Sequence, residues 1–179
     1  MRFLTRKLLV ALLLLAPALT AQPGNPSAAA QKAALEKLKF LTGSWAGEAT
    51  VSLGPGRPMQ LRQTEEVQFK LDGLLLLIEG TGRDDTGKVV FNALAVVSFD
   101  AAAGVYRIRA WTGGNTVETE LKVSAGGFEW TTPQGPVTVV HRMKIDEQGR
   151  WAETSEAVLA DGRRVPSVRM LLARQGDRP

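Results

Sequence analysis

Residues 137–145 read Val-Thr-Val-Val-His-Arg-Met-Lys-Ile, and this stretch decides the fold. Successive side chains of a β-strand point to opposite faces of the sheet. Val137, Val139, His141, Met143 and Ile145 therefore share one face, while threonine, arginine and lysine lie on the other. The alternation predicts a strand with an apolar interior face that contains a single imidazole.

Segments of the same kind fill the chain from Gly43 onward. Each has about 8 to 14 residues, is rich in valine, threonine and aromatic side chains, and ends at a turn signal. The nine turn signals are Gly54–Gly56, Asp72-Gly73, Asp84–Gly87, Asp100–Gly104, Gly113–Asn115, Gly126-Gly127, Pro133–Pro136, Asp146–Gly149 and Asp161-Gly162. Such short turns join antiparallel neighbours, because a parallel crossover needs a longer connection. We predict an all-β fold in which residues 43–175 form a ten-stranded antiparallel up-and-down β-barrel, followed by a tail at 176–179.

The first residues predict an export signal. Arg2, Arg6 and Lys7 precede a continuous apolar run at residues 8–15, and a small residue follows at Ala21. The run is shorter than the roughly 20 residues that span a bilayer. We predict that residues 1–21 are cleaved, that no membrane span remains, and that the mature chain is periplasmic or secreted.

A linker and one short helix are predicted for residues 22–42. Pro26 suits the first turn of a helix that Asn25 caps. Leu35, Leu38 and Leu41 then recur at helical spacing. This pattern predicts an amphipathic helix whose apolar stripe packs against the barrel, because so short a helix is marginal alone.

The composition excludes several classes of function. The chain has 179 residues with no cysteine and one histidine, which excludes thiolate chemistry and any metal site built from several imidazoles. Its 22 basic and 18 acidic residues give a net charge of +4, and three of the basic residues belong to the export signal. No basic cluster remains, which argues against nucleic-acid binding. Serine-hydrolase, phosphate-loop and dinucleotide motifs are missing from the sequence, so no catalytic residue is predicted and binding is favoured over catalysis.

Three titratable residues fall on the predicted interior faces. His141 lies on the apolar face of its strand, and Glu65 and Glu153 lie on the inward faces of two others. An unpaired carboxylate is costly in such a place, so each glutamate needs a partner or a shifted pKa. His141 suits a ligand-binding or acid–base role, or a structural hydrogen bond that fixes the register, and the structural role is favoured.

The segment around residues 105–112 allows two interpretations. Arg109 and Trp111 share one face of the predicted strand, whereas Tyr106 and Ile108 share the other. If the first face is interior, Arg109 pairs with an interior carboxylate or with the acidic head of a ligand. If it is exterior, Tyr106 and Ile108 fill the core instead, and the residue types slightly favour this second interpretation.

Tryptophans occur on three different predicted strands. Trp111, Trp130 and Trp151 either line one wall of a cavity that stacks a flat ligand or fill the core. A barrel of ten strands is wide enough to hold a small ligand. We therefore predict an interior site for a small apolar or amphipathic molecule, contacted by His141, Glu65, Glu153, Arg109, Trp111, Trp130 and Trp151.

Residues 74–78 and 89–99 are apolar on both faces, which an isolated barrel does not need. The pattern predicts that the N-terminal helix or a second subunit covers the outside of the barrel there. This gives an alternative function, in which the barrel is packed solid and acts as a structural or interaction module that forms a homodimer through its outer face.

The two ends of the barrel segment carry a recognisable pair. Gly43-Ser44-Trp45 opens the first predicted strand after a short helix, and Arg174 shares a face of the last strand with three apolar residues. Over residues 35–175 this pattern resembles the lipocalin and fatty-acid-binding-protein superfamily, the calycins. The resemblance implies that Trp45 closes the barrel floor and that Arg174 packs across its ring.

The segment Leu38–Glu48 is similar to two smaller groups. One is an uncharacterised family of secreted bacterial lipocalin-like domains, which also carry the features seen here at Ser98-Phe99-Asp100 and Tyr106. The other is the nitrobindin group of ten-stranded haem-binding barrels, which bind iron through a histidine near the chain end. Residues 150–175 contain no histidine, and His141 lies one strand earlier. The first group is therefore favoured, no cofactor is predicted, and haem binding is kept as the alternative.

Overall fold

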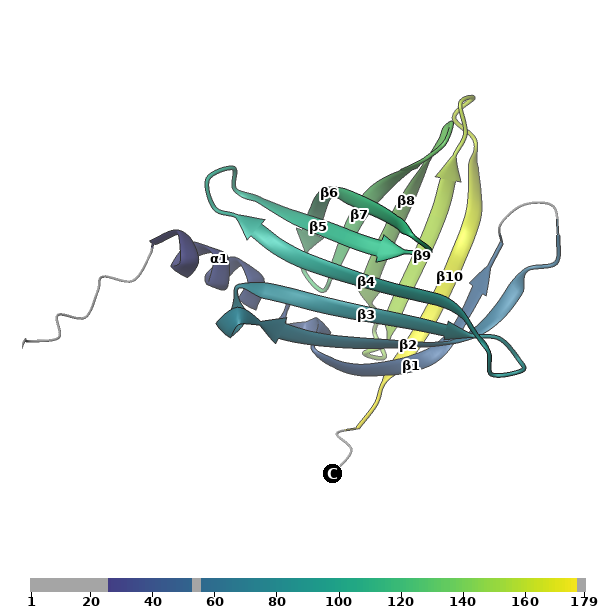
Figure 1. Ribbon diagram of the computed structural model, residues 1–179, viewed down its shortest axis with the longest axis horizontal. Helices are drawn as coiled ribbons and strands as arrows, with labels where there is room; N and C mark the ends of the chain where they lie inside the picture. The colour runs from purple at the N-terminus through teal and green to yellow at the C-terminus, as the bar shows by residue number, and fades with distance from the viewer. Residues whose placement is uncertain (1–25, 53–55, 177–179) are drawn as a thin grey trace, which may run out of the picture.

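The computed structural model describes residues 26–52 and 56–176, and within them ten strands close into one barrel (Figure 1). Consecutive strands pair antiparallel, and β1 pairs with β10 to complete the ring. The predicted ten-stranded up-and-down barrel is confirmed. The strands are β1 (Gly43–Val51), β2 (Met59–Lys70), β3 (Leu75–Arg83), β4 (Val89–Asp100), β5 (Val105–Thr112), β6 (Asn115–Ser124), β7 (Gly127–Gln134), β8 (Val137–Ile145), β9 (Trp151–Val158) and β10 (Arg164–Arg174).

The N-terminal helix packs at one end of the barrel. The helix α1 (Pro26–Glu36) is shorter than the leucine spacing predicts, and Leu41 belongs to a separate 3-10 turn, η1 (Lys39–Leu41). The Tyr106 hydroxyl donates to the Ala34 carbonyl at 2.8 Å, and the Gln31 amide donates to the Leu74 carbonyl at 2.7 Å. These bonds hold α1 beside the start of β3 and β5 and the end of β4 (Figure 1). We call this the closed end of the barrel, and the opposite end the open end.

Parts of the sequence-based prediction fall on residues that the structure does not describe. The predicted export signal at 1–21, the cap residue Asn25 and residues 177–179 of the predicted tail lie outside the described residues. Among the residues that are described, no helix is both long and apolar enough to cross a bilayer.

Trp45 is the centre of the floor at the closed end. Its ring is 1% exposed, and its indole nitrogen donates to the Leu41 carbonyl at 2.8 Å. The guanidinium of Arg174 lies 4.1 Å from the ring centroid and donates to the carbonyls of Phe40 and Thr42. A cation over an aromatic face is attracted by the ring quadrupole, so the first and last strands are joined here by more than backbone hydrogen bonds.

The outer wall of β3 and β4 is only partly covered. Val89 and Val90 are exposed, and the outward side chains of Leu77 and Val96 are half-buried. Phe91 pairs with Gly82 and belongs to the inward face at the open end. The hydrogen bonds of α1 lie at the closed end of this wall. Residues 74–78 and 89–99 are apolar on both faces and predict a covered outer wall. The helix covers only part of that wall.

The strand ladders differ in length around the ring. Between β6 and β7 only four residue pairs form, from Leu121↔Trp130 to Ser124↔Gly127. Toward the open end, residues 115–120 of β6 pair only with β5, and residues 131–134 of β7 pair only with β8. Figure 1 shows the consequence, since β7–β10 stand at a steep angle to β2–β5.

Candidate functional site

The inward face of the barrel carries polar side chains that begin directly above the floor, beside Trp45 and Trp151. They are Gln63 and Glu65 on β2, His141 on β8, and Glu153 and Ser155 on β9, and we call them the interior polar cluster. Strand alternation places each of them on the same face as core residues of its own strand. The sequence therefore sets polar groups directly above an apolar floor.

His141 is held on both sides by hydroxyl groups. Its Nδ1 lies 2.8 Å from Ser155 Oγ, and its Nε2 lies 3.0 Å from Thr132 Oγ1. The ring stacks on Trp130 with centroids 4.5 Å apart and planes 8° from parallel. Burial lowers the pKa of His141 to about 4, so the imidazole is neutral at pH 7. Iron ligation through either nitrogen would break one of these hydrogen bonds, and no feature of the site favours the haem alternative.

Glu65 lies beside a buried amide. Gln63 is 3% exposed and Glu65 is 7% exposed, and the Gln63 Nε2 donates to Glu65 Oε1 at 2.8 Å. Burial, together with the charge of Glu153, raises the pKa of Glu65 to about 8, and the hydrogen bond from Gln63 opposes part of that shift. The carboxyl group is therefore mostly protonated at neutral pH.

Glu153 projects inward from β9 above the floor. Its Oε2 accepts a hydrogen bond from the Trp151 indole nitrogen at 3.0 Å. Burial raises the pKa of Glu153 to about 7, and the bond from Trp151 partly opposes that shift. Near pH 7 the combined negative charge of the two glutamates is therefore smaller than two.

Three oxygens of the cluster have no hydrogen-bond partner among the described residues: Gln63 Oε1, the second oxygen of Glu65, and Glu153 Oε1. Of the side-chain polar atoms in the part of the chain described, Ser167 Oγ is the one that is both fully buried and without a partner. The three oxygens must therefore reach space that is open to water. Since their side chains point inward, this space lies inside the barrel.

Small residues leave room for the cluster. A Cβ at Gly80 would lie 2.8 and 2.9 Å from the Glu65 carboxyl oxygens, and one at Gly82 would lie 2.7 Å from Gln63 Oε1. The two glycines face these residues across the β2–β3 ladder. Further alanines continue the inward lining toward the open end on the remaining walls, at Ala93, Ala95, Ala110 and Ala157.

Gly80→Ala should displace the Glu65 carboxyl group, because the added methyl would overlap it. We expect the variant to lose about 1 to 3 kcal/mol in the free energy of unfolding, as overpacked interiors do. Urea denaturation measures the loss. Gly56→Ala is the matched control, because no atom of the described residues lies within 4 Å of the added methyl there. Equal stability of the two variants would contradict the proposed close packing of Glu65 against β3.

Arg109 and Trp111 lie on the outer wall, which corrects the prediction that they contact an interior ligand. Ile108, their neighbour on β5, is 4% exposed and belongs to the core, so alternation turns Arg109 and Trp111 outward. Arg109 forms a 3.9 Å ion pair with Glu118, and its guanidinium lies 5.2 Å from the Trp111 ring centroid. Both residues line a shallow depression on the outer wall of β3–β6.

The predicted tryptophan wall does not form either. Trp151 is 2% exposed and packs edge-on against Trp45 at 5.8 Å and Phe128 at 6.1 Å, so its ring belongs to the floor. Trp130 alone of the three tryptophans combines an inward position with partial exposure, beside His141. The interior site therefore contains one stacked aromatic ring.

Sequence reasoning missed several residues of the site. Gln63 occupies the same face of β2 as Glu65, and the period-two pattern around Glu65 is a signal that could have found it. Thr132 and the glycines of β3 gave no such signal, because their role depends on which strands are neighbours and in which register.

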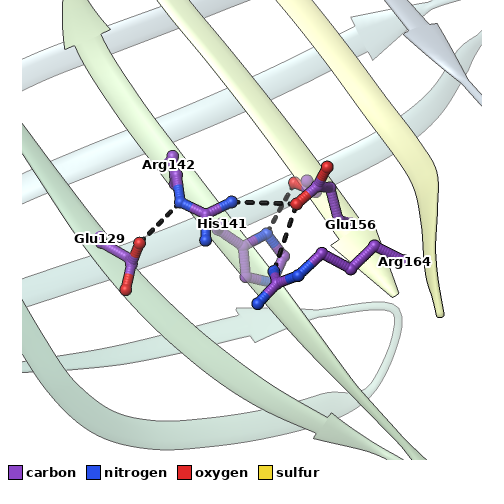
Figure 2. A network of polar contacts seen from close by, with 6 residues as sticks. Glu129, His141, Arg142, Glu156 and Arg164 are labelled. Atoms are coloured by element: carbon purple, nitrogen blue, oxygen red, sulfur yellow. Dashed lines mark hydrogen bonds and ion pairs between the residues drawn. The ribbon is translucent and has the colours of Figure 1, made fainter. Parts of the chain in front are cut away.

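The outer face behind His141 carries a chain of ion pairs. Figure 2 shows Arg142, the next residue on β8, between Glu129 and Glu156, with Arg164 also reaching Glu156. The nitrogen–oxygen distances are 2.7 Å to Glu129, 3.0 Å to Glu156, and 3.3 Å for Arg164. This chain crosses β7 to β10 and ties together the strands that carry Trp130, His141 and Glu153.

Comparison with known proteins supports the fold. No protein-family model matches the chain, and no curated protein has a significantly similar sequence. Among solved structures, Rv2717c from M. tuberculosis is similar, with a TM-score of 0.61 and 15% identity over 80% of this chain and 98% of that one. The S-type phycobiliprotein lyase CPES from Guillardia theta is also similar, with a TM-score of 0.58 and 11% identity over 81% of this chain and 94% of that one. At these identities the likeness shows a shared barrel fold and nothing finer.

Proposed function

We propose that this barrel binds a small apolar or amphipathic molecule inside its open half, with the interior polar cluster fixing the orientation of the ligand. The observation that carries the proposal is the set of three unpartnered oxygens on Gln63, Glu65 and Glu153, which keep some exposure to solvent above a packed floor. Polar groups left without partners in a folded interior are costly unless water or a ligand satisfies them.

The lining of the open half supports an apolar body for the ligand. Its inward positions include alanines and glycines among larger apolar side chains such as Leu61, Phe91 and Val139, whereas the closed half is filled by leucines and aromatic rings. Small side chains leave volume for a guest, and apolar area that the guest removes from water stabilises the complex by about 25 cal/mol per Å². A few convergent polar groups at the base of an apolar site are typical of ligand pockets.

Filling the interior should abolish binding. Ala93 points inward and Leu94, the next residue of β4, points outward. We expect Ala93→Phe to lower the affinity for a neutral fluorescent probe, N-phenyl-1-naphthylamine, by about tenfold or more, because the ring occupies the ligand space. Leu94→Phe adds a ring on the outer wall of the same strand and should leave the affinity unchanged.

Fluorescence titration of both variants measures this effect, with circular dichroism to verify that each barrel is folded. Equal loss in both variants, or loss in Leu94→Phe alone, would place the binding surface outside the barrel. That result would favour the interaction-module alternative instead.

A further inference from the structure

The interior polar cluster is rich in hydrogen-bond acceptors and poor in donors. Glu65 faces Trp45 across the β1–β2 ladder, and the Trp45 ring packs against Trp151 at 5.8 Å. Trp151 in turn donates to Glu153, so the two glutamates lie over the same part of the floor, where the charge of one acts on the other. The indole N–H of Trp151 and the amide N–H of Gln63 are each already donated to one of these carboxyl groups. When both glutamates are ionised, as they are beside a cation, their remaining capacity consists of oxygens that accept.

Gln63 provides an independent sign of a missing donor. Gln63 is 3% exposed. The orientation of the amide is fixed, because the NH₂ group has acceptors on both sides, Glu65 Oε1 at 2.8 Å and the Thr64 carbonyl at 3.4 Å. The amide oxygen therefore points away from them and lies over Gly82 of β3, where no group of the described residues donates to it.

The barrel wall supplies no cation for these acceptors. In the described part of the chain, one arginine occupies an inward strand position, Arg174, and it is committed to Trp45 and to two backbone carbonyls at the floor. Arg109, which the sequence analysis considered as an interior residue, forms its ion pair with Glu118 on the outer wall. His141 is stacked and bonded on both ring nitrogens.

We propose that the ligand carries a protonated primary amine, and that this ammonium group sits between Glu65 and Glu153 and donates to Gln63 Oε1. The proposal rests on the proposed function, because it names the head group of the molecule that the barrel holds. An alkylammonium has three N–H donors and no acceptor, which matches the three free oxygens in number and kind. The apolar body of the amine then lies along Trp130 and the alanine-lined open half.

The same chemistry disfavours other ligands. The carboxylate of a fatty acid would enter a site that has two acids and no free base, so repulsion and desolvation oppose its binding. A bare metal ion is a poor fit, because no group of three His, Cys, Asp or Glu side chains within residues 26–52 and 56–176 is placed to hold one. A single organic cation needs only the two carboxylates and the amide oxygen.

Three probes with the same ten-carbon tail and different heads test the proposal. Decylammonium is cationic at pH 7.5, decanol is neutral and decanoate is anionic. Isothermal titration of the intact protein below micelle-forming concentrations should give decylammonium about tenfold tighter binding than decanol, with decanoate weakest. Glu65→Gln and Glu153→Gln should each reduce that preference to about threefold or less and leave decanol unchanged.

Glu66→Gln is the matched control, because Glu66 neighbours Glu65 but points outward, where it accepts a hydrogen bond from Ser44 Oγ at 2.6 Å. It should retain the full preference for decylammonium. Decylammonium binding should also release protons at pH 7.5, because the ammonium favours the ionised carboxylates; titrations in two buffers of different ionisation enthalpy detect this.

The outcomes separate the two proposals. Equal affinity for the three probes, or a preference for decanoate, overturns the amine proposal while the ligand-binding barrel stands. Loss of preference in Glu66→Gln as well as in the interior variants also overturns it, because the effect would then be general surface charge. Failure of all three probes and of N-phenyl-1-naphthylamine to bind overturns both.

Discussion

Trp45→Ala should lower the free energy of unfolding by about 3 to 5 kcal/mol, as removal of a buried aromatic ring does. Trp45 is 1% exposed, contacts Trp151 edge-on at 5.8 Å, and donates to the Leu41 carbonyl at 2.8 Å. The substitution leaves a cavity in the floor, removes the ring under Arg174, and leaves a carbonyl without its donor. Each effect falls at the point where β1 and β10 close the barrel.

Urea denaturation monitored by far-UV circular dichroism measures this loss. Trp111→Ala is the matched control, because Trp111 is 37% exposed on the outer wall and should cost less than about 1 kcal/mol. If the two variants were equally stable, the closing role of Trp45 would be wrong. A smaller loss in Trp45→Ala than in Trp111→Ala would show that the outer wall contributes more to folding than the floor.

The number and order of the strands in the barrel follow from local patterns in the sequence. Period-two alternation marks the strands, and short turns force antiparallel neighbours, so the order of the strands leaves little choice. The residues of β8 illustrate this, because Val139 and Met143 are buried and Lys144 is exposed, as the alternation predicts. Closure through β1 and β10 was implied by the Trp45 and Arg174 pattern rather than by any local signal.

The candidate site is less predictable, because the face on which a side chain lies and the strand with which it pairs depend on residues far away in the sequence. On β5 both faces carry large side chains, so composition alone could not decide that Ile108 points inward and Arg109 outward. The correct face follows only from the pairing of Ile108 with Val97, which is 1% exposed. The hydroxyl partners of His141 come from β7 and β9, and nothing in β8 itself identifies them.

Glu65 and Glu153 were placed inside correctly by alternation, and the expectation that each would find a partner or shift its pKa applies to both. Each accepts one hydrogen bond and each has a raised pKa. What alternation could not supply is the space around them, since the room at Gly80 depends on the register of β2 against β3. An inward carboxylate is therefore visible in the sequence, and the space that Gly80 leaves for it is not.

Raising the pH from 6.5 to 9 should destabilise the protein, and Glu65→Gln should remove about 2 kcal/mol of that loss. The pKa of Glu65 rises from 4.5 to about 8 on folding. Between these values the folded state keeps a proton that the unfolded state has released. The free energy of unfolding therefore falls as the pH rises toward 8, by about 1.4 kcal/mol for each pH unit. Glutamine resembles the protonated acid and does not titrate.

Glu153 contributes in the same direction up to its pKa of about 7, so some of the loss should remain in Glu65→Gln. His141 acts oppositely, but only at lower pH: its pKa falls from 6.5 to about 4 on folding, so it destabilises the protein as the pH drops below 6.5. Starting the comparison at pH 6.5 separates the glutamates from the histidine.

Urea denaturation at each half pH unit, with Glu66→Gln as the exposed control, measures the slopes. Glu66→Gln should parallel the wild-type protein, because its side chain is exposed on the outer face. A flat wild-type profile above pH 6.5 would mean that Glu65 is ionised or solvated in the folded state. Decylammonium binding at pH 7.5 would then release no proton from Glu65.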